Sequence, residues 1–186
     1  MHNIFTWSGG KVSISGSLWT NGNSLQSQLY NLSTKSQFVI NNIDVNNFSI
    51  DSFIEKINKS DYNVQNLDND INSSITTGRT NIRDISGDIE LQKGIVLLKN
   101  IKFATQYSSG AASCTVNIYN FDIDSSSILS FYIPDKFVKL NNLHTSSDKV
   151  SLTQLNIRMH GSIFEPKKTF DSSKLKTILI PQTTYE

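Results

Sequence analysis

The second half of the chain is a succession of strand-length segments, and this pattern limits the possible fold more than any other feature. From residue 81 onward, apolar and polar residues alternate with the period of two that is typical of a strand. Turn-forming residues interrupt the alternation at 93–94, 108–110 and 124–126. The pattern predicts an antiparallel meander with strands at 81–91, 94–107, 112–124, 127–133 and 152–163.

The apolar residues change face within two of these segments. The change falls between Leu98 and Ile101 in one segment, and between Ile118 and Phe121 in the other. Such a change indicates a β-bulge or a sheet that is covered on different sides at different points, as in a curled sheet. We therefore expect a mainly β (α+β) fold, with a curved, mostly antiparallel sheet or half-barrel and two or three short helices packed on it.

Residues 1–59 predict a unit of strand, helix, strand and helix. Alternation at 10–19 indicates a half-buried strand, and Ser24 is typical of a cap for a helix at 25–32. Between 36 and 50 the apolar residues come in pairs separated by asparagines, which indicates strand pieces broken by bulges or tight turns. Asp51 or Ser52 begins a second helix at 53–59, and both short helices need a sheet to pack on.

Residues 60–80 have the poorest composition for a core. Val64, Leu67, Ile71 and Ile75 stand isolated among Asn, Asp and Ser, so we expect a long, mobile connection. The meander and a last helix at 171–179 complete 81–186, and we expect the 186 residues to form a single domain.

Charge and cysteine content exclude several classes of partner and site. Seventeen Lys and Arg against 16 Asp and Glu give a net charge of +1, so we expect no nucleic-acid partner. Cys114 is the single cysteine, which excludes an intrachain disulfide, and its alternation with Val116 predicts a small buried side chain. The longest apolar run, 94–98, falls far short of the ~18 residues that span a bilayer.

Catalytic and cofactor motifs are missing from the sequence. His2, His144 and His160 have no partner at metal-binding spacing, and there is no Gly-x-Ser-x-Gly motif or glycine-rich phosphate loop. Asp122 and Asp124 are close enough to share a cation, but they lie outside any calcium-loop pattern and favour a turn. We therefore expect a protein that is not an enzyme, with no catalytic, cofactor-binding or metal-binding residues.

Three blocks of sequence follow one another in a recognisable order. They are GSLWTNGNSL at 16–25, ISGDIELQKGIV at 85–96 and MHGSIFEP at 159–166. In this order and spacing, and over nearly the whole chain, they resemble the C-terminal domain of AsmA-like proteins. The chain departs from that family at Ser33-Thr34, where a glycine usually follows the first helix.

The resemblance implies a protein of the Gram-negative cell envelope. Such a protein would be held in the inner membrane by an N-terminal anchor absent from this sequence, with its β-rich body in the periplasm. It would take part in phospholipid transport between membranes or in outer-membrane assembly, with phospholipid acyl chains and other envelope proteins as its partners. The implied structure is a curved sheet whose apolar groove keeps acyl chains out of water. Each CH₂ removed from water contributes ~0.8 kcal/mol of favourable transfer free energy.

The alternating apolar residues of the meander are the candidates for such a groove. They are Ile101, Phe103, Val116, Ile118, Leu129, Phe131, Ile133, Leu155 and Ile157. Two alternatives stay open. The same residues would equally form a closed core beneath the helices, and a chain rich in Ser and Asn with few charges also fits a structural or adhesive β-domain of a surface or phage protein.

Overall fold

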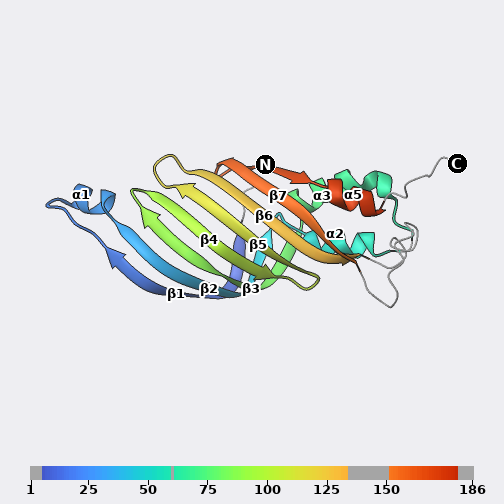
Figure 1. The fold of residues 1–186 in the computed structure, drawn as a ribbon, viewed down its shortest axis with the longest axis horizontal. Coiled ribbons are helices and arrows are strands. Elements are labelled where there is room, and N and C mark those ends of the chain that lie inside the picture. Colours follow the sequence, from blue (N-terminus) through green and yellow to red (C-terminus); the bar gives the residue numbers. More distant parts are fainter. Residues whose placement is uncertain (1–5, 60, 134–150, 180–186) are drawn as a thin grey trace.

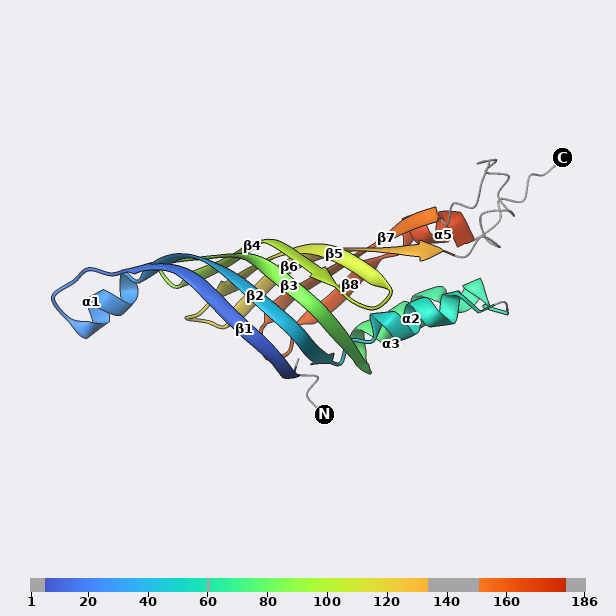
Figure 2. The same cartoon turned by 90° about the horizontal axis from the view of Figure 1, so that it is seen from below.

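A single open antiparallel sheet of eight strands forms the body of the protein in the computed structural model, which describes residues 6–59, 61–133 and 151–179. The strands lie side by side in chain order, and Figures 1 and 2 show that the sheet is curved. This confirms the predicted fold class. The strands are β1 (Trp7–Trp19), β2 (Ser33–Asn46), β3 (Arg79–Gln92), β4 (Ile95–Ala104), β5 (Ser108–Asn117), β6 (Asp122–Ile133), β7 (Ser151–Ser162) and β8 (Lys167–Asp171).

Among the described residues, four α-helices and one short 3₁₀ helix accompany the sheet. They are α1 (Leu25–Tyr30), α2 (Ile50–Ile57), η1 (Val64–Asn66), α3 (Leu67–Thr76) and α5 (Ser173–Leu179). Helices α2, α3 and α5 gather at one end of the molecule, whereas α1 lies at the opposite end (Figures 1 and 2). Within the described part of the chain, no helix has the length and hydrophobicity needed to cross a membrane.

The predicted bulge between Leu98 and Ile101 is confirmed. Pairing of β4 with β5 shifts register there, and Asn100 adopts a positive φ of 52°. The turn at Lys93-Gly94 is also confirmed, because both residues have positive φ, as a tight two-residue hairpin requires.

Two of the expected turns were wrong. Residues 108–110 lie in β5 and residues 124–126 lie inside β6. The chain reverses instead between Asn117 and Asp122, where the side chains of Asn117 and Asn120 accept hydrogen bonds from the amides of Tyr119 and Asp122. The apparent change of face after Ile118 is therefore this turn and not a bulge.

The first hairpin differs from the expectation in its burial. Ser24 does cap α1, since its Oγ accepts a hydrogen bond from the Ser27 amide at 3.2 Å. However, Leu25 is 73% exposed, so this side chain does not pack on the sheet as predicted. Strand β1 is exposed along its whole length instead of half-buried, because no helix covers its end of the sheet.

The prediction of a connection without secondary structure at 60–80 was wrong. Most of this stretch is helical, with η1 leading into α3. Leu67, Ile71 and Ile75 recur every fourth residue, so they form one stripe on α3, and each is at most 1% exposed. Burial of this stripe in the hydrophobic core offsets the conformational entropy that the segment loses when it becomes ordered.

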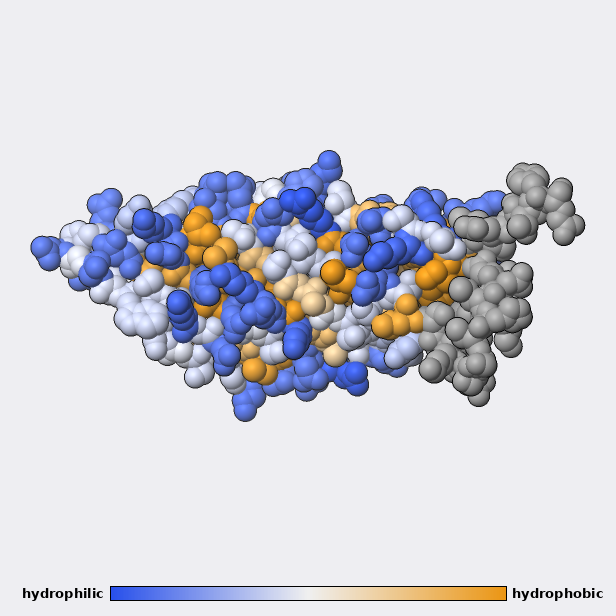
Figure 3. Space-filling model, in the orientation of Figure 1, coloured by the Kyte–Doolittle hydropathy of each residue, from blue (hydrophilic) through white to orange (hydrophobic). Residues whose placement is uncertain are grey.

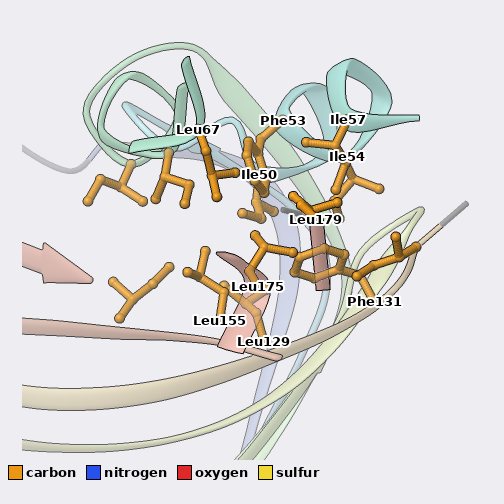
Figure 4. Packing of buried hydrophobic residues seen from close by; sticks show 14 residues of the cluster. Ile50, Phe53, Ile54, Ile57, Leu67, Leu129, Phe131, Leu155, Leu175 and Leu179 are labelled. Carbon is orange, nitrogen blue, oxygen red and sulfur yellow. The ribbon is translucent and has the colours of Figure 1, made fainter. Parts of the chain in front are cut away.

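The hydrophobic core lies between the helices and one end of the sheet. Figure 4 shows side chains of α2 and α3 opposite those of β6, β7 and α5. Phe53 and Phe131 meet edge to face, with ring centroids 6.1 Å apart. Asp51 of α2 accepts a hydrogen bond from the Thr105 hydroxyl at 2.6 Å, which ties the start of the helix to the β4–β5 turn.

Candidate functional site

The face of the sheet on which α2, α3 and α5 pack, here called the inner face, is apolar well beyond the helices. Strand register places apolar residues of successive strands in rows across it. One row is Val12, Ile40, Ile85, Phe103, Gly110, Leu129 and Leu155. A second is Leu18, Thr34, Leu91, Val96, Val116, Ile123 and Gly161. Because these rows cross from β1 to β7, the inner face offers a mostly apolar floor to whatever lies on it, with Thr34, Ser36 and Ser125 as polar members.

The opposite, outer face is mostly polar. It carries serines of β1, β3 and β5 together with Asp88, Glu90 and Asp124. Val39, Ile128 and Tyr132 are exposed apolar exceptions on this face. The contrast between the two faces follows from the period of two in the strands, which sends alternate side chains to opposite sides.

The helices divide the inner face into a covered part and an uncovered part. Leu129, Phe131, Ile133 and Leu155 lie in the covered part, and each is at most 1% exposed within the core. These four residues were wrong as groove candidates, because α2, α3 and α5 occupy the space above them (Figure 4). These four residues form part of a closed core beneath the helices, as the alternative interpretation predicted.

A small apolar cavity of about 180 Å³ lies where the helices end. Three groove candidates, Ile101, Phe103 and Ile157, line it, but Ile101 and Ile157 are buried, and Ile157 also belongs to the sealed core. Its other lining residues are Val45, Phe48, Ile75, Ile82, Ile85, Ser127, Met159 and Lys168. The cavity marks the point at which the sealed core gives way to the open part of the inner face.

The uncovered part of the inner face runs from this cavity toward α1. We call it the open groove, and its floor consists of the half-buried residues Ile89, Leu91, Val96, Leu98, Val116 and Ile123. At its β1 side, Val12, Ile14 and Leu18 are 58–67% exposed. So much unpartnered apolar surface is unusual for a protein that binds nothing. Figure 3 looks onto the opposite, outer face of the sheet, where hydrophobic residues are interrupted by hydrophilic ones.

A larger cavity of about 750 Å³ lies at the α1 end of the open groove. The groove candidate Ile118, 43% exposed, lines it together with Leu91 of the floor. Its remaining lining residues are Ser24, Gln26, Ser27, Tyr30, Asn31, Leu32, Gly94 and Tyr119. These described residues offer hydroxyl and amide groups and no formal charge, so this end of the groove combines an apolar floor with neutral polar walls.

A glycine makes room for an aromatic ring on the inner face. A Cβ built at Gly87 would stand 2.9 Å from Cε1 of Phe38, on the neighbouring strand. The Phe38 ring therefore lies flat over β3, and only 7% of the residue is exposed.

Lys168 lies beside the small cavity. Its ammonium donates hydrogen bonds to the carbonyl oxygens of Ile75 at 2.6 Å and Asn47 at 3.2 Å. Burial disfavours the charged form and lowers the pKa of Lys168 to about 8. This lysine links β8 to α3 and to the end of β2, and so holds the helical end of the groove together.

The remaining titratable groups have structural surroundings. Across residues 6–59, 61–133 and 151–179, no group of three His, Cys, Asp or Glu side chains could hold a metal ion. Asp124 accepts two hydrogen bonds from Arg158, at 3.1 and 3.2 Å, which lower the pKa of that carboxyl. Cys114 is half-buried on the inner face, and burial raises the pKa of its thiol to about 11. His2 and His144 lie outside the described residues, and His160 is exposed.

Sequence reasoning missed two parts of this site. Phe48 and Ile75 line the small cavity from segments that were expected to be a piece of broken strand and a mobile connection. The spacing of Ile75 from Ile71 and Leu67 was the signal that could have found it.

Comparison with known proteins finds no matching protein family, no similar curated protein and no similar solved structure. The resemblance to AsmA-like proteins therefore stays a prediction.

Proposed function

We propose that the open groove binds phospholipid acyl chains and that the protein is a non-enzymatic lipid-handling domain. In this proposal it is the terminal module of an AsmA-like envelope protein in the periplasm, held by an inner-membrane anchor upstream. Its role is in phospholipid transport between membranes or in outer-membrane assembly. The observation that carries the proposal is an apolar floor that continues past the sealed core without a helix to cover it.

The physical support is the one-sidedness of the sheet. Floor residues such as Ile89, Leu98 and Val116 are half-buried although no helix lies on them. Each CH₂ of an acyl chain laid on such a floor gains up to ~0.8 kcal/mol by leaving water. A chain of ordinary length therefore gains several kcal/mol from the apolar contact alone, before any contact to its head group.

The sealed core sets the direction from which a lipid would enter. Phe131 and Leu155 fill the inner face at the helical end, so the path is closed there. At the other end the groove meets the 750 Å³ cavity with its neutral polar walls. We infer that acyl chains lie between the two cavities and that an uncharged or zwitterionic head group lies toward α1.

A face-specific substitution tests the proposal directly. Val116→Glu places a carboxylate on the open floor, where it can still reach water, so the chain should stay folded and lose bound lipid. Ser113→Glu introduces the same charge on the outer face of the same strand and should leave lipid binding unchanged. The measurement is native mass spectrometry after incubation with phospholipid vesicles, with circular dichroism to confirm folding.

Two results would contradict the proposal. One is a wild-type chain that retains no phospholipid mass under conditions in which it stays folded. The other is equal lipid retention by the Val116→Glu and Ser113→Glu variants, since binding would then not involve the floor. Either result would favour the structural or adhesive alternative, whose support is the serine-rich outer face.

A further inference from the structure

The two edges of the sheet are very different. Strand β8 at one edge has five residues and carries Lys167 and Lys168. Strand β1 at the other edge has 13 residues, no proline and one charged residue, Lys11. Natural proteins protect exposed edges with short strands, lysines, prolines or covering loops. Strand β1 has little of this protection, and every residue in it is exposed.

The sequence of β1 is partly symmetric about Ser15. Ser13 and Ser17 flank it, the similar residues Val12 and Leu18 lie at equal distances from it, and Ile14 corresponds to the smaller Gly16. Inner-face residues thus match inner-face residues, and outer-face serines match serines. A strand with this symmetry is complementary to a second copy of itself that runs in the opposite direction.

We propose that two copies of this chain pair antiparallel through β1, with Ser15 facing Ser15 of the second copy. In this register Val12 lies opposite Leu18 on the inner face. On the outer face Lys11 lies opposite Trp19, a residue that is 51% exposed and whose ring can offer a face to the cation. Like charges do not meet anywhere along the nine paired residues from Lys11 to Trp19, because Lys11 is the only charge among them.

The pairing begins where the strand becomes regular. Gly9 and Gly10 have positive φ values of 73° and 84°, which interrupt the pattern of extended backbone. From Lys11 to Trp19 the pairing of β1 with β2 is continuous, so the outward backbone groups of this stretch repeat regularly. A second strand needs such a regular row of donors and acceptors for its own hydrogen bonds.

The twofold axis of this pairing runs perpendicular to the sheet, so both inner faces point to the same side. Two eight-stranded sheets then become one, and the exposed Val12, Ile14 and Leu18 of each copy meet in the middle of a shared apolar floor. This arrangement gives a partner to the most exposed apolar residues of the inner face. It does not depend on what the open groove binds.

The oligomeric state of the 186-residue chain tests the proposal. Sedimentation velocity should show a dimer for the wild-type protein, and Ser15→Glu should raise its dissociation constant by about fivefold or more, because two carboxylates face each other across the axis. Ser109→Glu, which adds the same charge to the outer face of β5 far from the edge, should leave the dimer intact. Circular dichroism checks that both variants are folded.

Cysteine cross-linking tests the register. In a Cys114→Ser background, Ser15→Cys should form a disulfide-linked dimer under mild oxidation, since facing strand residues lie ~5 Å apart. Ser13→Cys should not, because residue 13 faces residue 17 and its own counterpart lies four residues away, at ~13 Å. A monomeric wild-type chain, a dimer unaffected by Ser15→Glu, or equal cross-linking at positions 13 and 15 would overturn the proposal.

Discussion

The ring of Phe103 lies directly over Gly110, its partner on the neighbouring strand. A Cβ built at Gly110 would stand only 2.2 Å from Cζ of Phe103. The absence of a side chain at this position therefore lets the ring turn flat onto the sheet, between the core residue Leu129 and the small cavity. The glycine is needed here for space and not for backbone conformation.

Gly110→Ala should displace Phe103 and destabilise the protein. Overpacking of this kind costs roughly 1–3 kcal/mol in the free energy of unfolding. Urea denaturation measures the loss, and Ser109→Ala on the outer face of the same strand is the matched control. Combining Gly110→Ala with Phe103→Leu should recover part of the stability; purely additive effects would show that the two residues do not interact.

Ile71→Ala should destabilise the protein by about 2–5 kcal/mol, because Ile71 is fully buried in α3. The neighbouring Asn72 is exposed, so Asn72→Ala should change the free energy of unfolding by less than about 0.5 kcal/mol. Chemical denaturation of both variants provides the comparison. Equal stability of the two would mean that α3 is not packed against the core.

Asp51→Ala should loosen the β4–β5 turn. The Asp51 carboxylate accepts hydrogen bonds from the Thr105 hydroxyl and from the amides of Gln106 and Tyr107, at 3.3 and 3.4 Å. Their loss should cost roughly 1–3 kcal/mol and speed hydrogen exchange at the Gln106 and Tyr107 amides. Unchanged exchange at both amides, with the helix still folded, would contradict this role for Asp51.

Lys168 should make stability depend on pH in the alkaline range. Its pKa is about 8 in the folded protein and 10.5 ordinarily, so the unfolded chain binds more protons between these values. The free energy of unfolding of the wild-type protein, measured relative to Lys168→Met, should therefore rise from about pH 8 to 10.5 and stay level outside this window. A difference that falls or stays constant across the window would contradict burial of the ammonium.

The meander could be predicted from the sequence because alternation is a local signal. The bulge at Asn100 was visible in the change of parity between Leu98 and Ile101. The β5–β6 turn was not recognised in the same way, because the change of parity between Ile118 and Phe121 was interpreted as a bulge, although Val116 and Ile123 face each other on two strands. Asparagine side chains that bond to nearby amides define this turn, and the sequence is rich in Asn at many other places.

Whether an apolar strand residue lies in the core or on an open floor could not be predicted locally. Leu129 and Val116 have the same alternation, yet one is fully buried and the other is only half-buried. The difference depends on where α2, α3 and α5 rest on the sheet, and α3 itself was missed. The burial of a strand residue therefore depends on helices that are distant from it in the sequence.

Strict chain order in the sheet makes the length of the inner face adjustable. Every strand pairs only with strands that precede or follow it directly, so another hairpin inserted at a strand connection would break only the pairing at that connection and replace it with three pairings of the same kind. Each added hairpin would lengthen the floor by two strand spacings, ~9.6 Å, and leave the helical core where it is. Evolution could therefore widen or narrow this surface by hairpin duplication or loss, independently of the residues that stabilise the domain.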